Sequence, residues 1–225
     1  MKILALEFSS PRRTAAVIDS LAPERSTAGA SFVPRPSAIR GTPAIYALDL
    51  IESALREAGL EREQIECLAV GLGPGSYTGI RAGIALAQGW QLASGVRLLG
   101  ISTADCLAAE AQAAGLRGNV GVVIDAQRNE FYLATYEITD NARRETEALR
   151  LAPFPQVQAA AQAGQLLIGP EVEKWFPGGR VLFPGAATLA RLAVARTDFI
   201  PGERLEPIYL RETAFVKAPP PRRIL

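Results

Sequence analysis

The sequence of 225 residues contains no histidine, three lysines and two cysteines. Because histidine is the commonest general base and the commonest metal ligand, its absence argues against much hydrolytic chemistry and against zinc chemistry. The cysteines, Cys67 and Cys106, lie in apolar segments and have the spacing of neither a metal site nor a disulfide framework. That pattern is typical of a reducing compartment, so we expect a cytoplasmic protein.

An excess of either charge is also missing. Lysine and arginine total 24 against 23 for aspartate and glutamate, which leaves a net charge of +1. Such a balance provides no basic surface for holding a nucleic acid unaided. No stretch reaches the ~20 apolar residues of a membrane span, and the apolar run at the N-terminus is too short for a signal peptide. The sequence thus favours neither an independent nucleic-acid binder nor a membrane protein.

What the sequence does contain is the periodicity of an α/β fold in two related halves. In each half an apolar strand ends on a carboxylate, Glu7 or Asp125, and an arginine-bearing turn leads into a returning strand. The first half is expected to hold strands at 3–8, 14–19, 30–33, 65–70 and 97–101 and helices at 43–58 and 76–93. A helix at 104–114 follows, and the second half is expected to hold strands at 120–125, 131–137, 165–168 and 180–183 and helices at 155–163 and 187–196.

The most distinctive segment is a glycine-rich turn between the strand at 65–70 and the helix at 76–93. A dinucleotide-binding fingerprint that began at Gly71 would need a glycine where Ser76 stands, and a P-loop would need a lysine, which this segment lacks. A tight turn that only positions the helix is therefore one interpretation. Because helix N-termini attract anions, the other is a contact with an anion or nucleotide, for which the candidate residues are Ser76, Thr78, Arg12 and Arg128.

Small residues line two faces of the helix that follows this turn. One face carries a glycine or alanine every four residues from Gly75 to Ala87, and the other carries Ala85, Gly89 and Ala93. Since each helical glycine costs about 1 kcal/mol relative to alanine, we expect another backbone to approach closely. Packing on the chain's own sheet would account for one face, and a partner protein would account for the second. The predicted interface comprises Gly75, Tyr77, Gly79, Arg81, Gly83, Ala87 and Trp90, with Ile45 and Leu48 of the preceding helix.

Glu7 and Asp125 form a second candidate site. If the two halves close on a cleft, these carboxylates could hold Mg²⁺ in an independent ATPase or phosphotransferase. Hairpins that grip phosphate use glycine in the turn, whereas the turns here, Ser9-Ser-Pro-Arg-Arg13 and Ala126-Gln-Arg-Asn129, contain none. Ordinary turn anchors are the alternative, and the sequence predicts neither a metal nor a cofactor.

Four segments resemble the TsaB (YeaZ) family, which takes part in forming threonylcarbamoyladenosine in bacterial tRNA. The most specific is Val70-Gly-Leu-Gly-Pro-Gly-Ser-Tyr-Thr-Gly-Ile-Arg-Ala-Gly83. The others are Leu98-Leu-Gly-Ile-Ser-Thr103, Val123-Ile-Asp-Ala-Gln-Arg128 and Pro207-Ile-Tyr-Leu-Arg211. The chain departs from the family at its first strand, which ends Glu7-Phe-Ser-Ser10 where the family usually has Asp-Thr-Ser.

The resemblance implies an actin-like, sugar-kinase-type α/β fold with a lobe at 1–103, a reduced lobe at 104–217 and a flexible tail at 218–225. It also implies a non-catalytic scaffold and dimerisation subunit of the complex that forms N6-threonylcarbamoyladenosine beside the anticodon. Such a subunit docks on and activates a larger TsaD-type transferase, which a TsaE-type ATPase joins transiently. The same resemblance implies a homodimer in isolation and contact with tRNA only through the complex.

Overall fold

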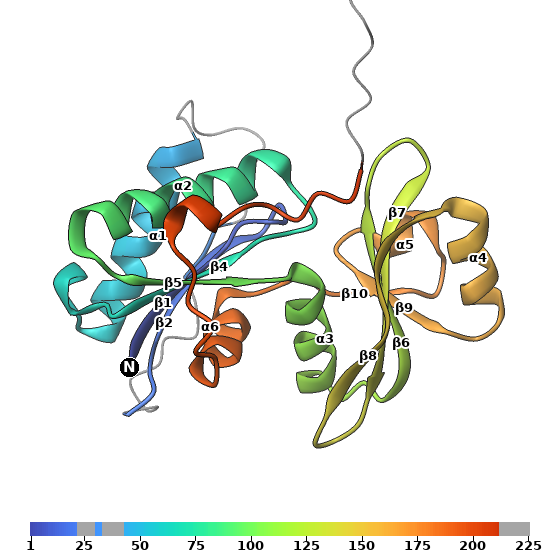
Figure 1. Ribbon diagram of the computed structural model, residues 1–225. Helices are drawn as coiled ribbons and strands as arrows, with labels where there is room; N and C mark the ends of the chain where they lie inside the picture. The colour runs from blue at the N-terminus through green and yellow to red at the C-terminus, as the bar shows by residue number, and fades with distance from the viewer. Residues whose placement is uncertain (22–29, 33–42, 212–225) are drawn as a thin grey trace, which may run out of the picture.

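The protein is described by a computed structural model, which covers residues 1–21, 30–32 and 43–211. Two five-stranded sheets form two lobes that lie side by side (Figure 1). The first sheet contains β1 (Lys2–Glu7), β2 (Arg13–Asp19), β3 (Ala30–Phe32), β4 (Cys67–Gly71) and β5 (Arg97–Ile101). The second contains β6 (Gly118–Asp125), β7 (Glu130–Ile138), β8 (Arg143–Pro153), β9 (Leu166–Gly169) and β10 (Arg180–Val181).

The two sheets have the same topology. The first has the order β3-β2-β1-β4-β5 and the second, read from its other edge, β8-β7-β6-β9-β10. In both sheets the first strand pairs antiparallel with the second, and the second antiparallel with the third. The first strand also pairs in parallel with the fourth, and the fourth in parallel with the fifth. This correspondence confirms the predicted repeat and the actin-like fold.

Helices cover both faces of the first sheet. The apolar sides of α1 (Pro43–Ala58) and α2 (Tyr77–Ser94) pack with one set of alternating strand residues, and α6 (Ala186–Val194) packs with the other set. The predicted ends of α2 are correct to one residue, because the hydroxyl of Ser76 accepts a hydrogen bond from the Gly79 amide and Gly95 follows in the left-handed conformation.

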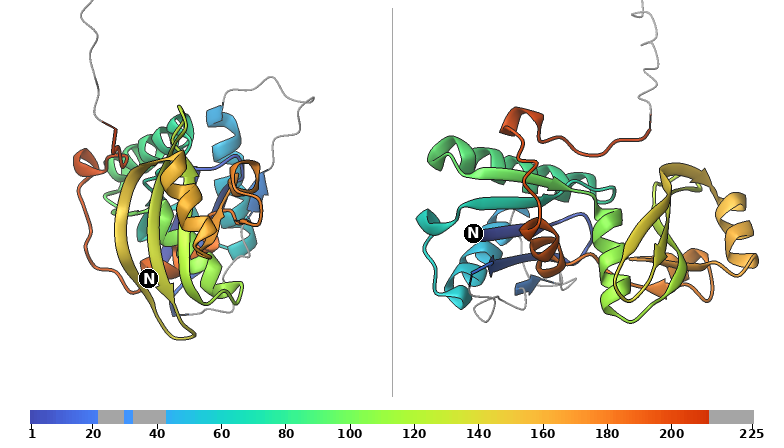
Figure 2. Two further views of the ribbon diagram at one scale, coloured as in Figure 1. Left: turned by 90° about the vertical axis from the view of Figure 1, so that its right-hand side faces the viewer. Right: turned by 60° about the horizontal axis from the view of Figure 1, so that its bottom comes forward.

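The second lobe ends earlier than predicted. Its core includes α3 (Thr103–Ala113) and, on the other face of the sheet, α4 (Phe154–Gln162) and the short α5 (Val172–Trp175). The predicted lobe at 104–217 is wrong for α6, because this helix lies against the first sheet (Figure 2). Its apolar residues pack on the face of that sheet opposite α1 and α2. Strand β8 and helix α5 were not predicted at all. The predicted tail at 218–225 lies outside the described residues.

The described C-terminal segment connects the two lobes. After α6 the chain continues along the first lobe, where Leu205 is buried and the Ile208 amide donates a hydrogen bond to the Leu72 carbonyl. It then crosses toward the second lobe (Figure 1), where the Arg211 guanidinium donates to the Ala126 carbonyl at 2.9 Å and pairs with Glu130 at 2.6 Å. This segment is anchored on the first lobe and therefore holds the β6–β7 turn of the second lobe in place.

This contact predicts the effect of Arg211→Ala. Loss of the half-exposed ion pair and of the backbone hydrogen bond is expected to lower the free energy of local opening of the turn at residues 126–130 by about 1 kcal/mol. Amide hydrogen exchange in this turn should then be roughly fivefold faster. Arg204→Ala, in the 3₁₀ turn of the same segment, is the control and should leave that exchange unchanged. Equal protection in the Arg211→Ala variant and the unaltered protein would contradict the role assigned to Arg211.

Candidate functional site

The first row of small residues packs inside the chain, which corrects part of the predicted interface. A Cβ atom on Gly79 would overlap the Phe8 carbonyl oxygen, and one on Gly83 would lie 3.4 Å from a methyl carbon of Val70. Ala87 is completely buried. Gly75 precedes the helix, in a conformation with φ +150° where a Cβ would overlap the Ser9 carbonyl. The expected close approach is therefore made by the backbone of Phe8 and Ser9, just after strand β1 of this chain, and this row is closed to a partner.

The second row of small residues faces outward. Ala85, Gly89 and Ala93 are exposed, and a Cβ on Gly89 would have no heavy atom within 4 Å. With α1 they border a groove of about 480 Å³, which we call the α1–α2 groove. Its apolar wall consists of Leu48 and Ile51 from α1 and Ala85, Leu86, Gly89, Trp90 and Ala93 from α2. Leu48 and Trp90 were predicted from the sequence, whereas the side chain of Ile45 lies outside the described part of the chain.

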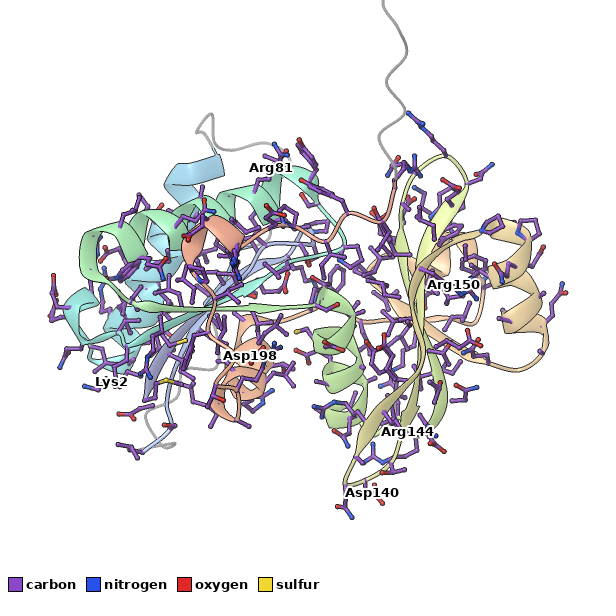
Figure 3. All side chains as sticks on the ribbon, viewed as in Figure 1. Lys2, Arg81, Asp140, Arg144, Arg150 and Asp198 are labelled. Atoms are coloured by element: carbon purple, nitrogen blue, oxygen red, sulfur yellow. The ribbon has the colours of Figure 1, made fainter. Side chains whose placement is uncertain are left out.

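Large exposed side chains continue this face along α2. Residues 78, 81, 85, 89 and 92 are all exposed and share one side of the helix, and the side chain of Leu92 is 90% exposed. Near the start of α2, which Figure 3 marks by Arg81, the Arg81 guanidinium donates to the Tyr209 hydroxyl at 2.8 Å and lies 4.3 Å from the centre of the Tyr77 ring. Both rings are about half exposed. The contact of Arg81 with Tyr209 could not be predicted from the sequence, because the two residues are 128 positions apart in the chain.

A second hollow lies between the lobes. This interlobe cleft of about 270 Å³ is bordered by Ser9, Ser10, Gly75 and Ser76 on one side and by Asp125, Gln127, Tyr132 and Glu171 on the other. It therefore carries two carboxylates, and no lysine or arginine of the described residues is among those that line it. Such a lining disfavours an anionic ligand.

The predicted anion contacts are accordingly not assembled. Of the four candidates only Ser76 borders the cleft, where its hydroxyl also accepts the capping hydrogen bond from the Gly79 amide. Arg12 instead stacks on Phe183, with 4.0 Å between the guanidinium carbon and the ring centre. Thr78 and Arg128 do not line the cleft. The structure thus supports the interpretation of the glycine segment as a turn that positions α2.

Glu7 and Asp125 do not form the predicted magnesium pair. Glu7 is completely buried, where its Oε1 accepts a hydrogen bond from the Ser9 amide at 2.8 Å and its Oε2 has no partner among the described residues. Gly71 makes room for this carboxyl group, since a Cβ there would overlap it. Burial raises the pKa of Glu7 to about 7. Asp125 lines the cleft and accepts a hydrogen bond from the Gln127 amide, so the two carboxylates lack a common site.

Two further observations limit the chemistry available. Among the described residues, no cluster of three or more His, Cys, Asp or Glu side chains is arranged to hold a metal ion. In the same part of the chain, no helix has both the length and the apolar character needed to cross a membrane. The arrangement that stands out is therefore the α1–α2 groove with the outward face of α2.

Comparisons with known proteins identify the family of this chain. The family model described as "TsaD: tRNA N6-adenosine threonylcarbamoyltransferase" matches residues 44–195. The tRNA threonylcarbamoyladenosine biosynthesis protein TsaB of Escherichia coli K12 is 30% identical over 190 residues, which are 77% of this chain and 82% of that protein. The protein of the same name from Haemophilus influenzae is 29% identical over 193 residues, 76% of this chain and 81% of that protein.

Comparison with solved structures indicates the same family. The structure of YeaZ from Pseudomonas aeruginosa has a TM-score of 0.76 and 25% identity, covering 93% of this chain and 99% of that one. A crystal structure of a P. aeruginosa protein described as similar to peptidase YEAZ has a TM-score of 0.77 and 26% identity with the same coverage. From its sequence and its fold together, the chain belongs to the TsaB (YeaZ) family of tRNA threonylcarbamoyladenosine biosynthesis proteins.

Proposed function

We propose that this chain is a non-catalytic subunit of the assembly that forms N6-threonylcarbamoyladenosine in tRNA, and that it docks on and activates a larger TsaD-type subunit. The observation that carries the proposal is the exposed row of Ala85, Gly89 and Ala93 beside an apolar groove. We further propose that the same face joins two copies of this chain when the larger subunit is absent. A TsaE-type ATPase would join the assembly transiently, in the cytoplasm.

The groove has the properties of a helix-docking surface. Small residues on α2 let the backbone of a partner helix approach, while Leu48, Trp90 and Leu92 supply apolar area around them. The aromatic and arginine side chains at the start of α2 are of the types that dominate binding energy at interfaces. An interface of this kind is expected to bury about 800 Å² on each partner.

The proposed absence of catalysis is supported by the residues that face the interlobe cleft. Asp125 and Glu171 line the cleft without a lysine or arginine among the described lining residues, and Glu7 is buried in the core. The chain also has no histidine with which to reproduce a histidine-based metal centre. We therefore expect no heat of binding when the isolated chain is titrated with ATP and magnesium by calorimetry.

Gly89→Leu tests the docking face. Because nothing lies within 4 Å of the added Cβ, the variant is expected to fold normally, but its side chain fills the space that a partner helix needs. Overpacking of about 1–3 kcal/mol would weaken association roughly 5- to 150-fold. The measurements are light scattering across a dilution series for the homodimer and calorimetry for the complex with the TsaD-type subunit.

Ala159→Leu is the matched control, because it adds the same kind of side chain to an exposed position of α4 on the other lobe. This control is expected to associate like the unaltered protein. A folded Gly89→Leu variant that associates with unchanged affinity in both measurements would show that the partner docks elsewhere.

A further inference from the structure

A third hollow, away from the α1–α2 groove, gathers arginines from three segments of the chain. It lies between α3, the β7–β8 hairpin and α6, has a volume of about 440 Å³ and is lined by Arg117, Arg143 and Arg191 together with Gln112, Asp140 and Thr188. We call it the arginine pocket. In Figure 3, Asp140 marks its hairpin at the lower tip of the second lobe, while Arg81 marks α2 at the top of the first. A ligand in the pocket would therefore not obstruct docking on α2.

Only one of the three arginines is paired with a carboxylate in the pocket. The Arg117 Nε atom donates to Asp140 at 2.6 Å. Arg143 instead donates to the side-chain oxygen of Gln112, and Arg191 donates to the Thr188 hydroxyl at 2.6 Å. Both of these acceptors are neutral, so the side chains that line the pocket carry an excess of two positive charges. Asp105 and Glu145 line the adjoining hollow that Arg143 also borders, and are not part of this pocket.

The neutral acceptors hold these two guanidinium groups in place. The side-chain amide nitrogen of Gln112 donates to the Thr139 carbonyl at 2.8 Å and the Ala142 carbonyl at 3.3 Å, which fixes the orientation of its oxygen toward Arg143. Thr188 is 3% exposed, and so its hydroxyl holds Arg191 from a rigid position on α6. Each guanidinium has five N–H donors, and one bond to a neutral acceptor leaves most of them for a ligand.

From this pair of positioned arginines we infer that the arginine pocket binds a phosphate group. The planar donor fork of arginine matches phosphate oxygens, and two unneutralised guanidinium groups gain a counter-charge when phosphate binds. Two sources share this chemistry. One is the phosphodiester backbone of an RNA, and the other is a small molecule that carries a diphosphate.

The experiment compares two double variants of the full chain that have the same net charge. Arg143→Gln with Arg191→Gln removes the inferred site, whereas Arg144→Gln with Arg150→Gln removes two arginines that pair with Glu137 and Glu147 on the same hairpin and strand. The probes are pyrophosphate, by calorimetry, and an anticodon stem-loop RNA, by fluorescence anisotropy at several salt concentrations. The site variant is expected to lose affinity at least about tenfold and the control to bind like the unaltered protein.

The two probes distinguish the source of the phosphate. Pyrophosphate binding that is lost only in the site variant assigns the pocket to a small molecule. RNA binding without pyrophosphate binding, again lost only in the site variant, assigns it to an RNA backbone. If the unaltered chain binds neither probe at 50 mM salt, or if both double variants lose affinity equally, the inference is overturned.

A thermal unfolding curve of each variant confirms that it is folded. Should the glutamine variant unfold, Arg143→Lys with Arg191→Lys keeps both charges but loses the planar fork, and is expected to bind with intermediate affinity. Binding as strong as in the unaltered protein would then contradict the assignment of these two guanidinium groups. Because every measurement uses the isolated chain, its outcome leaves the proposed docking on a TsaD-type subunit untouched.

Discussion

Replacing Gly79 by alanine is expected to destabilise the protein by about 3 kcal/mol, whereas Gly89→Ala in the same helix is expected to stabilise it by up to about 1 kcal/mol. At Gly79 the new methyl group would overlap the Phe8 carbonyl oxygen, so α2 must move away from the segment that follows β1. At Gly89 it meets nothing within 4 Å, and only the gain in helix propensity remains. The two variants therefore distinguish the buried row of small residues from the exposed row by their opposite effects on stability.

Thermal unfolding checks this contrast. For a chain of this size, 3 kcal/mol corresponds to a fall in Tm of roughly 6–12 °C, while Gly89→Ala should raise Tm by a few degrees. Both variants are compared at the same low protein concentration, because self-association would add stability of its own. Equal and small effects at the two positions would mean that the Gly79 row is not packed against Phe8.

Glu7→Gln is expected to make the protein more stable at pH 8 by about 3 kcal/mol and to change its stability little near pH 4.5. The pKa of Glu7 rises from an ordinary value of 4.5 to about 7 because burial disfavours the charged carboxylate. The folded state therefore holds this proton more tightly than the unfolded state does. The contribution of Glu7 to stability is full below pH 4.5 and is lost as the pH rises to 7.

The measurement is the free energy of unfolding in urea at pH 5 and pH 8. The unaltered protein should lose stability relative to Glu7→Gln between these two values, since the neutral amide occupies the same space without titrating. Glu173→Gln, which removes an exposed carboxylate from α5, is expected to keep the pH dependence of the unaltered protein. A constant difference between Glu7→Gln and the unaltered protein at both pH values would contradict the buried, titrating carboxyl.

Most of the fold could be predicted where periodicity and end signals agree. The helix at residues 43–58 has a proline at its first position, an apolar face and a glycine after its last residue, and the structure has these same bounds. Strand β8 could not be predicted, because its first six residues are exposed and charged or polar apart from Ala148, which gives no apolar alternation. Its conformation follows from pairing with β7, a contact that periodicity within one segment does not contain.

The candidate site could be predicted only in part. A spacing of four residues places Gly79 and Gly83 on one face of the helix and Ala85 and Gly89 on another. Helical periodicity alone does not determine which of these faces packs on the sheet. In the folded chain Phe8 and Val70 pack against the row that contains Gly79 and Gly83, which buries this row. The row that contains Gly89 has no such neighbours and stays exposed.

The sequence by itself determined the repeated α/β pattern, the ends of the helices with clear capping signals and membership of the TsaB family. Each of these depends on patterns and motifs of residues that are close together in the sequence. Only the tertiary structure decided that α6 packs on the first lobe, that Glu7 is sealed away from Asp125 and that Arg143 and Arg191 line one pocket. These outcomes depend on contacts between segments far apart in the chain, where the fit of one surface on another, rather than local preference, sets the free energy.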